Sequence, residues 1–196
     1  EACLEAIAMA LDRPMTLFQL QSPVPFAAEP DTEGLSSGLC TGFSTLDFDD
    51  QPVTDAIFAQ AKLTLVHVWG ISCIPNLKDL QTMDEIARVY APQGVQVLGV
   101  PCDITFSDGT RNAQAFKDAR ALASQAKAHH RQLVPDAVLH RMLQETTIVP
   151  TVYFVDAKGC LLGPGITGSR EWSEWITLLD AALQSTLEES EPAGGA

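Results

Sequence analysis

The chain has 196 residues and a formal net charge of −13, with 25 acidic against 12 basic side chains. Hydrophobic residues make up 46% of it, which is enough for a packed core and excludes global disorder. The acidity argues against nucleic-acid binding, because contacts to phosphates need clustered lysine and arginine. It also disfavours an anionic membrane surface. Five cysteines are too few for a disulfide-built scaffold, so the open question is whether one of them is reactive.

The first 41 residues are predicted to be an N-terminal extension. Residues 1–12 have apolar side chains at helical spacing, and Pro14 ends that pattern. Residues 21–40 are rich in proline and glycine, which is typical of an irregular linker. Cys3 and Cys40 lie in this extension; they could pair with each other, but their spacing does not establish it.

The middle of the chain predicts a strand–helix–strand unit. A strand over residues 43–48 and a short helix over 55–60 precede it. Residues 63–69 form a nearly continuous apolar run, as in a strand buried on both faces. Residues 76–90 have helical spacing, and residues 95–100 predict the next buried strand. Such a unit is expected to be parallel and right-handed.

The last third is predicted to contain two helices, a hairpin and a closing helix. An alanine-rich helix is expected from about residue 111 to 130, and a shorter one over 136–144. A strand over 152–155 is followed by a turn at 156–159 and a return strand that begins at 160–162. The closing helix is expected over 172–187, and an acidic, glycine-rich tail over 188–196.

Two motifs complete this picture. Trp69-Gly-Ile-Ser-Cys-Ile-Pro-Asn76 follows the first buried strand, and Val149-Pro-Thr-Val-Tyr-Phe-Val-Asp156 carries the third. Taken with the order of elements, they resemble the thioredoxin-like superfamily, in its TlpA/ResA-like (redoxin) branch. The resemblance implies an α/β thioredoxin-like fold over residues 42–187. Its central mixed sheet is flanked by helices, with a helical insertion before a cis-proline.

The resemblance places the reactive group at Cys73. Its thiol should lie near the N-terminus of the following helix, where unpaired N–H groups and the helix dipole favour a thiolate. The second cysteine of the family motif is replaced by Asn76, so the loop is a monothiol motif. The Asn76 amide could donate to the sulfur, or it could simply cap the helix or face solvent. Cys73 could also be a packing cysteine that has lost its chemistry.

The resemblance also implies a substrate-binding set. Trp69 and Pro75 would shape the loop, and Pro150 is expected to be cis and to pack beside the reactive cysteine. Val149 would offer backbone groups to an extended substrate, with Thr151 continuing the same segment.

Two further residues are candidates for supporting the thiol. His67 shares a strand face with Trp69 and could tune Cys73 or hold a water, although a satisfied core histidine is the commoner case. Cys102 follows the second buried strand, whose carboxyl end faces the same edge as Trp69. It could resolve a mixed disulfide, or it could be a buried packing cysteine.

The remaining cysteine and histidines are not expected to act. Cys160 lies in the predicted hairpin, at the far end of the strand that begins after Pro150. His129, His130 and His140 have no recognisable metal-ligand spacing, and the adjacent pair is expected on the solvated surface of a helix. We therefore expect no metal and no cofactor.

Two functions remain open. The first is a thiol–disulfide oxidoreductase that works through mixed disulfides at Cys73, with a protein or small-molecule thiol as its partner. The second is a redox-inactive binding module that holds a peptide or a partner protein. The resemblance suggests an extracytoplasmic bacterial setting, and any targeting or membrane-anchoring segment is expected upstream of Glu1.

Overall fold

The computed structural model describes residues 41–72, 76–106 and 109–190. The predicted helix over residues 1–12, Cys3 and Cys40 lie outside these residues, as do Cys73, Ile74 and Pro75. In chain order the elements are β1 (Ser44–Leu46), β2 (Pro52–Thr54), η1 (Asp55–Gln60), β3 (Leu63–Trp69), α2 (Asn76–Tyr90), η2 (Ala91–Gln93), β4 (Val95–Pro101), α3 (Ala113–Gln125), β5 (Arg131–Gln132), α4 (Ala137–Glu145), β6 (Thr151–Asp156), β7 (Ile166–Thr167) and α5 (Trp172–Ser190).

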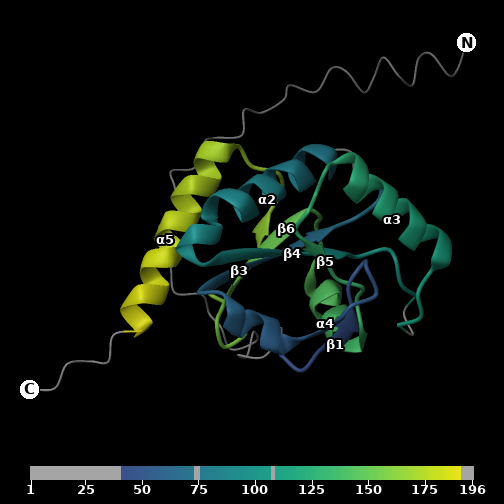
Figure 1. Cartoon of the computed structure of the whole chain (residues 1–196), viewed down its shortest axis with the longest axis horizontal. Helices are drawn as coiled ribbons and strands as arrows, with labels where there is room; N and C mark the ends of the chain where they lie inside the picture. Colours follow the sequence, from purple (N-terminus) through teal and green to yellow (C-terminus); the bar gives the residue numbers. More distant parts are fainter. Residues whose placement is uncertain (1–40, 73–75, 107–108, 191–196) are drawn as a thin grey trace, which may run out of the picture.

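A five-stranded mixed sheet runs through the centre in the order β5-β4-β3-β6-β7 (Figure 1). β3 pairs in parallel with β4 and antiparallel with β6. The chain therefore leaves β3 and β4, and enters β6, at one edge of the sheet. That edge follows Trp69 in β3 and Pro101 in β4, and it precedes Thr151 in β6.

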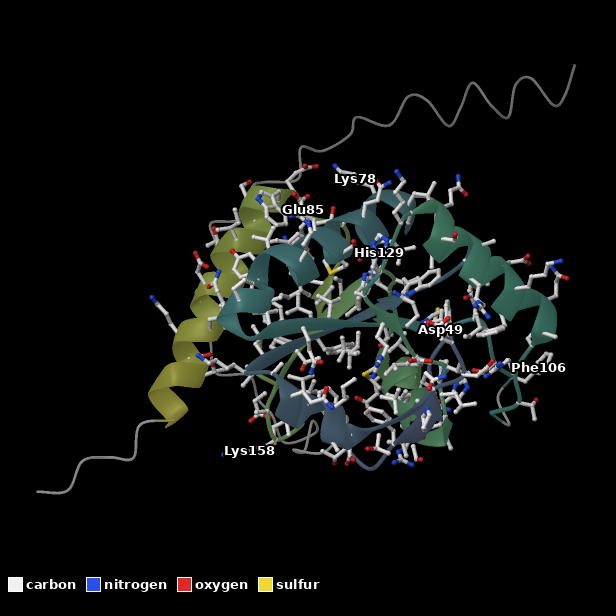
Figure 2. The ribbon with its side chains drawn as sticks, in the orientation of Figure 1. Asp49, Lys78, Glu85, Phe106, His129 and Lys158 are labelled. Carbon is white, nitrogen blue, oxygen red and sulfur yellow. The ribbon has the colours of Figure 1, made fainter. Side chains whose placement is uncertain are left out.

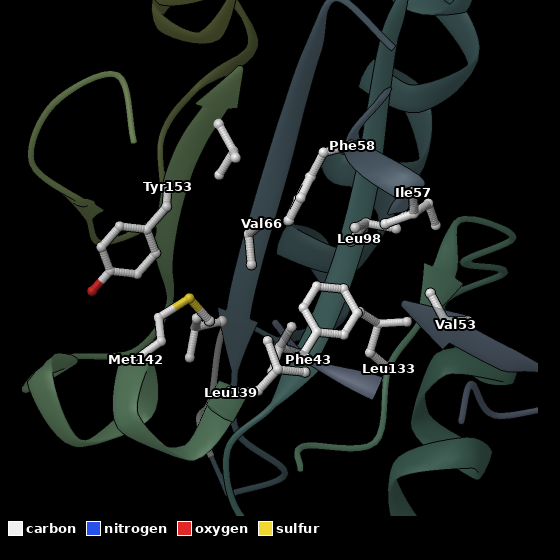
Figure 3. Close-up of a cluster of buried hydrophobic side chains, with 13 residues drawn as sticks. Phe43, Val53, Ile57, Phe58, Val66, Leu98, Leu133, Leu139, Met142 and Tyr153 are labelled. Atoms are coloured by element: carbon white, nitrogen blue, oxygen red, sulfur yellow. The ribbon is translucent and has the colours of Figure 1, made fainter. Parts of the chain in front are cut away.

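Helices cover both faces of the sheet (Figure 1). On one face α2 and α5 pack over Leu65 of β3 through Met83, Trp175 and their neighbours. α3 joins α2 on that side, where a third cluster surrounds Trp69. On the other face α4 and η1 enclose Val66 of β3 together with Phe43, Leu139 and Met142 (Figure 3). No helix in the described part of the chain is long and apolar enough to span a membrane.

The central elements are confirmed as predicted. β3 and α2 have the expected bounds, β4 extends one residue further, and the β3–α2–β4 unit is parallel. This agreement has a simple cause: β3 is buried at all seven positions, so its composition alone identifies it.

Several other expectations were wrong. The helix expected to reach residue 130 ends at Gln125, because Lys127 adopts a left-handed backbone with φ 54°. Residues 131–132 then form β5 beside β4. The return strand β7 pairs with β6 only at residues 166–167, and Leu161 makes an isolated bridge to Val155. The closing helix continues to Ser190, three residues past its expected end.

Candidate functional site

The edge of the sheet where β3 and β4 end carries the loop that leads to α2. The amide of Cys102 donates to the carbonyl of Trp69 across 2.8 Å, which continues the pairing of β3 and β4 by one residue. The motif loop begins at Gly70 and reaches α2 at Asn76, the first residue of that helix. Cys73 and Pro75 lie outside the described residues, so the site is built from the segments on either side of them.

Three side chains converge on Gly70. A Cβ atom at this position would lie 3.3 Å from Cys102 Sγ, 3.4 Å from Asp103 Oδ2 and 3.7 Å from Val149 Cγ2. The first two distances are tight for a carbon contact, so glycine allows a sulfur and a carboxylate to approach the loop. The structure thus brings Cys102 and Val149, both predicted as site residues, together three positions before Cys73. Cys102 is half-buried.

Asp103 binds the backbone amide of Ile71, the next residue of the loop. Its Oδ2 accepts a hydrogen bond from the amide of Ile71 across 2.8 Å. Asp103 itself is exposed. Sequence reasoning missed this residue, because its partner lies 32 positions away on another element. The only available signal was its position directly after Cys102, at the end of a buried strand.

Trp69 supports the loop from below. Its side chain has no exposed surface, and its Nε1 donates to Gln132 Oε1 across 2.9 Å. Because the ring is fully enclosed, Trp69 can act on a bound partner only through the shape that it gives to the loop. Gln132 reaches Trp69 by lying across Gly99, where a Cβ would come within 1.9 Å of Gln132 Oε1. Sequence reasoning also missed Gln132 and Gly99.

The segment before β6 has the expected position beside the loop. The Val149–Pro150 peptide bond is cis. The Thr151 side chain is 2% exposed and donates through Oγ1 to the carbonyl of Ile148 across 2.7 Å. Thr151 therefore positions this segment and cannot contact a substrate through its side chain. Ile148, which is 55% exposed, is the apolar side chain that this segment presents to solvent.

His67 is buried in the core, as expected. It is 1% exposed, and neither ring nitrogen has a hydrogen-bond partner in the described part of the chain. Burial, together with the nearby His130, lowers the pKa of His67 to about 3. The ring is therefore neutral at physiological pH.

The expectation that His129 and His130 share a solvated helix surface was half wrong. His129 is exposed and lies between α2 and α3 in Figure 2, whereas His130 is only 8% exposed. Both follow the end of α3, and both donate backbone N–H groups to Asp84 Oδ1 in α2. Burial alone would raise the pKa of Asp84. The hydrogen bonds from both histidines outweigh that effect and hold this pKa well below its usual range.

A second carboxyl that sequence reasoning missed lies in the first turn of α2. Asp79 is 7% exposed and its Oδ2 accepts from Ser169 Oγ across 2.9 Å. Burial raises the pKa of Asp79, which favours the protonated acid. A signal was present: Asp79 occupies the helical stripe of Met83 and Ile86, which is otherwise apolar.

The other candidates lie away from this edge. Cys160 follows the turn at Lys158, which is far from Lys78 of the first turn of α2 in Figure 2. The amide of Cys160 donates to Asp156 Oδ1 across 2.7 Å. His140 Nε2 lies 2.6 Å from Thr105 Oγ1. Among the described residues, no three histidine, cysteine or acidic side chains are grouped as a metal ion requires.

The sequence matches no protein-family model and no curated protein. Solved structures are similar to it in three dimensions. One is a thioredoxin-family thiol:disulfide interchange protein from Chlorobium tepidum TLS, with a TM-score of 0.60 and 17% identity, covering 75% of this chain and 97% of that chain. Another is a secreted Mycobacterium tuberculosis disulfide oxidoreductase, with a TM-score of 0.53 and 14% identity, covering 75% and 96%. A third is a thiol:disulfide interchange protein from a Bacteroides species, with a TM-score of 0.54 and 17% identity, covering 74% and 90%. The described part of the chain therefore has a thioredoxin-like fold.

Proposed function

We propose that the chain is a thiol–disulfide exchange protein that acts through Cys73. The observation that supports this proposal is the convergence of Cys102 Sγ and Val149 on Gly70. It places a second sulfur at the start of the loop that leads to Cys73. Asn76 replaces the usual second cysteine, so the second sulfur of the reaction has to come from elsewhere.

The proposed reaction has two exchange steps. The Cys73 thiolate attacks one sulfur of a substrate disulfide, so that a mixed disulfide forms and the other substrate sulfur leaves as a thiolate. In the second step the Cys102 thiolate attacks the Cys73 sulfur, which forms a Cys73–Cys102 disulfide and releases the remaining substrate thiolate. The substrate disulfide is reduced by two electrons and the protein is oxidised by two. An external thiol then returns the protein to its dithiol form.

Asp79 is suited to exchanging the protons that these steps require. Burial raises its pKa, so the acid form persists to higher pH than for an exposed aspartate. A protonated carboxyl in the first turn of α2 does not oppose a thiolate at that helix N-terminus, whereas a carboxylate there would repel it.

The partner is proposed to be a protein or small-molecule disulfide. The exposed Ile148 beside the Val149–Pro150 bond offers an apolar contact to an extended partner segment. We infer an extracytoplasmic setting, because one of the similar structures is of a secreted oxidoreductase. A membrane tether upstream of Glu1 remains part of this proposal.

Incubation with oxidised glutathione, followed by peptide mapping, tests the reaction. We expect a glutathione adduct on Cys73 that converts to a Cys73–Cys102 disulfide. Cys102→Ser should trap the adduct, and Cys73→Ser should abolish it. Cys160→Ser is the matched control and should behave like the unmodified chain, because Cys160 lies in the turn after β6.

The outcome that contradicts this proposal is also defined. It is an alkylation rate of Cys73 that follows an ordinary thiol pKa, with no mixed disulfide. Partner capture that persists in Cys73→Ser would then favour the redox-inactive binding module.

A further inference from the structure

Three buried polar side chains gather on the sheet face below the motif loop. His67 of β3, Gly99 of β4 and Gln132 of β5 are paired in one row across the sheet. Because residues paired in this way direct their side chains to the same face, His67 and Gln132 flank the space above Gly99. The Gln132 carboxamide fills part of that space and donates to the carbonyl of His130 across 3.2 Å. The backbone of His130 is therefore hydrogen-bonded to a residue of this row.

The hydrogen bonds of this cluster are incomplete. Gln132 is bonded at both ends of its carboxamide. His130 Nδ1 lies 3.4 Å from Asp84 Oδ1, but His130 Nε2 is buried with no partner in the described part of the chain. The same is true of both ring nitrogens of His67. Three buried ring nitrogens thus remain without a partner, in a cluster where every other polar group is paired.

Imidazole chemistry limits how these three nitrogens can be satisfied. A neutral ring has one N–H donor and one acceptor nitrogen, so His67 needs both an acceptor and a donor. The carboxylate of Asp84 fixes the His130 proton on Nδ1 and leaves Nε2 as an acceptor. His130 Nε2 therefore needs a donor, and the His67 ring N–H can supply its proton to Nε2 through a bridging group. A water both donates and accepts, and buried waters typically bond two to four polar groups.

We propose that an internal water lies between His67 and His130 and completes a hydrogen-bonded chain from His67 to Asp84. The water accepts the His67 ring N–H and donates to His130 Nε2. His130 in turn donates to Asp84, and Asp84 also contacts the exposed ring of His129 across 3.2 Å. The chain thereby connects a buried ring under the loop with solvent.

Two other features agree with this site. Burial and, to a smaller extent, the charge of His130 lower the pKa of His67, which agrees with the two rings lying on the same side of the sheet. The Asp84 carboxylate accepts hydrogen bonds from the rings and the backbone amides of both His129 and His130. The outer end of the hydrogen-bonded chain therefore has a fixed position. Neither feature depends on the reactivity of Cys73, so this proposal stands or falls separately from the proposed function.

Solution NMR of the ring N–H of His67 tests the proposal in the full chain. We expect a water cross-peak at that proton in the unmodified protein. His130→Phe removes the inner acceptor, so it should abolish the cross-peak. It should also slow the exchange of that proton with solvent, because the bridging water that accepts it is lost. His129→Phe, the same change on the neighbouring exposed histidine, should leave both observations unchanged.

The contrary results are equally distinct. A His67 ring proton without a water cross-peak would overturn the proposal. An exchange rate that is equal in all three proteins would overturn it too. If His130→Phe fails to fold, a high-resolution structure of the unmodified chain decides. A water bonded to a His67 ring nitrogen supports the site, and ring nitrogens that contact only apolar atoms refute it.

Discussion

The hydrogen bond between Trp69 and Gln132 is the contact through which β5 supports the motif loop. Trp69 has no exposed surface and Gln132 is 4% exposed, so neither partner can turn to water. The substitution Gln132→Met keeps an unbranched side chain of similar length but removes both the acceptor and the donor. Two bonds are lost, from Trp69 Nε1 across 2.9 Å and to the His130 carbonyl across 3.2 Å.

The expected cost follows from these two bonds. Leaving the buried indole N–H without an acceptor costs about 1–3 kcal/mol, and losing the second bond costs about 0.5–1.5 kcal/mol. We therefore expect Gln132→Met to lower the free energy of unfolding by about 2–4 kcal/mol. Urea-induced unfolding, followed by circular dichroism, measures it. Tryptophan fluorescence is less suitable, because Trp172 and Trp175 also contribute.

A double-mutant cycle with Trp69→Phe isolates the bond itself. Phenylalanine has no N–H group, so Gln132→Met should cost less by about 1–2 kcal/mol in that background. Gln96→Met is the matched control. It also removes two hydrogen bonds, to Ile57 and Thr64, at the opposite end of β4. The control should lower stability without changing the rate of Cys73 alkylation, whereas Gln132→Met should change both.

One result would refute this reasoning about Trp69. If Gln132→Met costs the same with tryptophan or phenylalanine at position 69, the two residues are not coupled. An unchanged rate of Cys73 alkylation in a folded Gln132→Met protein would show that β5 does not influence the loop.

Three further predictions concern the loop and the two carboxyls whose pKa values are shifted, Asp79 and Asp84. Gly70→Ala should lower the free energy of unfolding by about 1 kcal/mol in urea titrations and slow resolution by Cys102, because the added Cβ crowds its sulfur. The raised pKa of Asp79 means that its contribution to stability is present below the ordinary value of 3.8 and is lost as pH rises through the raised value. Asp79→Asn, which keeps an acceptor for Ser169, should therefore be the more stable protein at neutral pH and lose that advantage in acid. The pKa of Asp84 is lowered, so its contribution to stability is present above 3.8 and is lost as pH falls. Asp84→Asn should therefore lower the free energy of unfolding by about 2 kcal/mol at neutral pH. Thermal unfolding measured at several pH values should show that the stabilities of the unmodified and Asp84→Asn proteins approach each other in acid.

The sequence predicts the centre of the fold well because the central elements carry strong periodic signals. β3 is a seven-residue apolar run, and α2 repeats apolar side chains over four turns before Pro92. β5 and β7 have two residues each, which is too short to show any period. Their positions depend on where neighbouring strands end, and that information is not local.

The same distinction applies to the site. The meeting of Cys102 with Gly70 follows from topology, since the parallel strands β3 and β4 end at one edge. The contact from Asp103 to Ile71 depends on how a loop turns back over 32 residues, which no local pattern records. His130 was misplaced because an alanine-rich run predicts a long helix, whereas the left-handed backbone at Lys127 ends it.

The anchors of the motif loop explain how the site can keep its shape without its second cysteine. Asp103 holds the Ile71 amide from above, and Gln132 holds the Trp69 indole from below. Both anchors come from segments outside the Trp69–Asn76 motif, so the loss of a thiol at position 76 removes neither of them. The entry to the loop is therefore fixed by β5 and by the segment that follows β4, while the proposed exchange chemistry depends on which sulfur can reach Cys73. A change at position 76 can then alter the proposed exchange route while leaving the approach of Val149 to Gly70 in place.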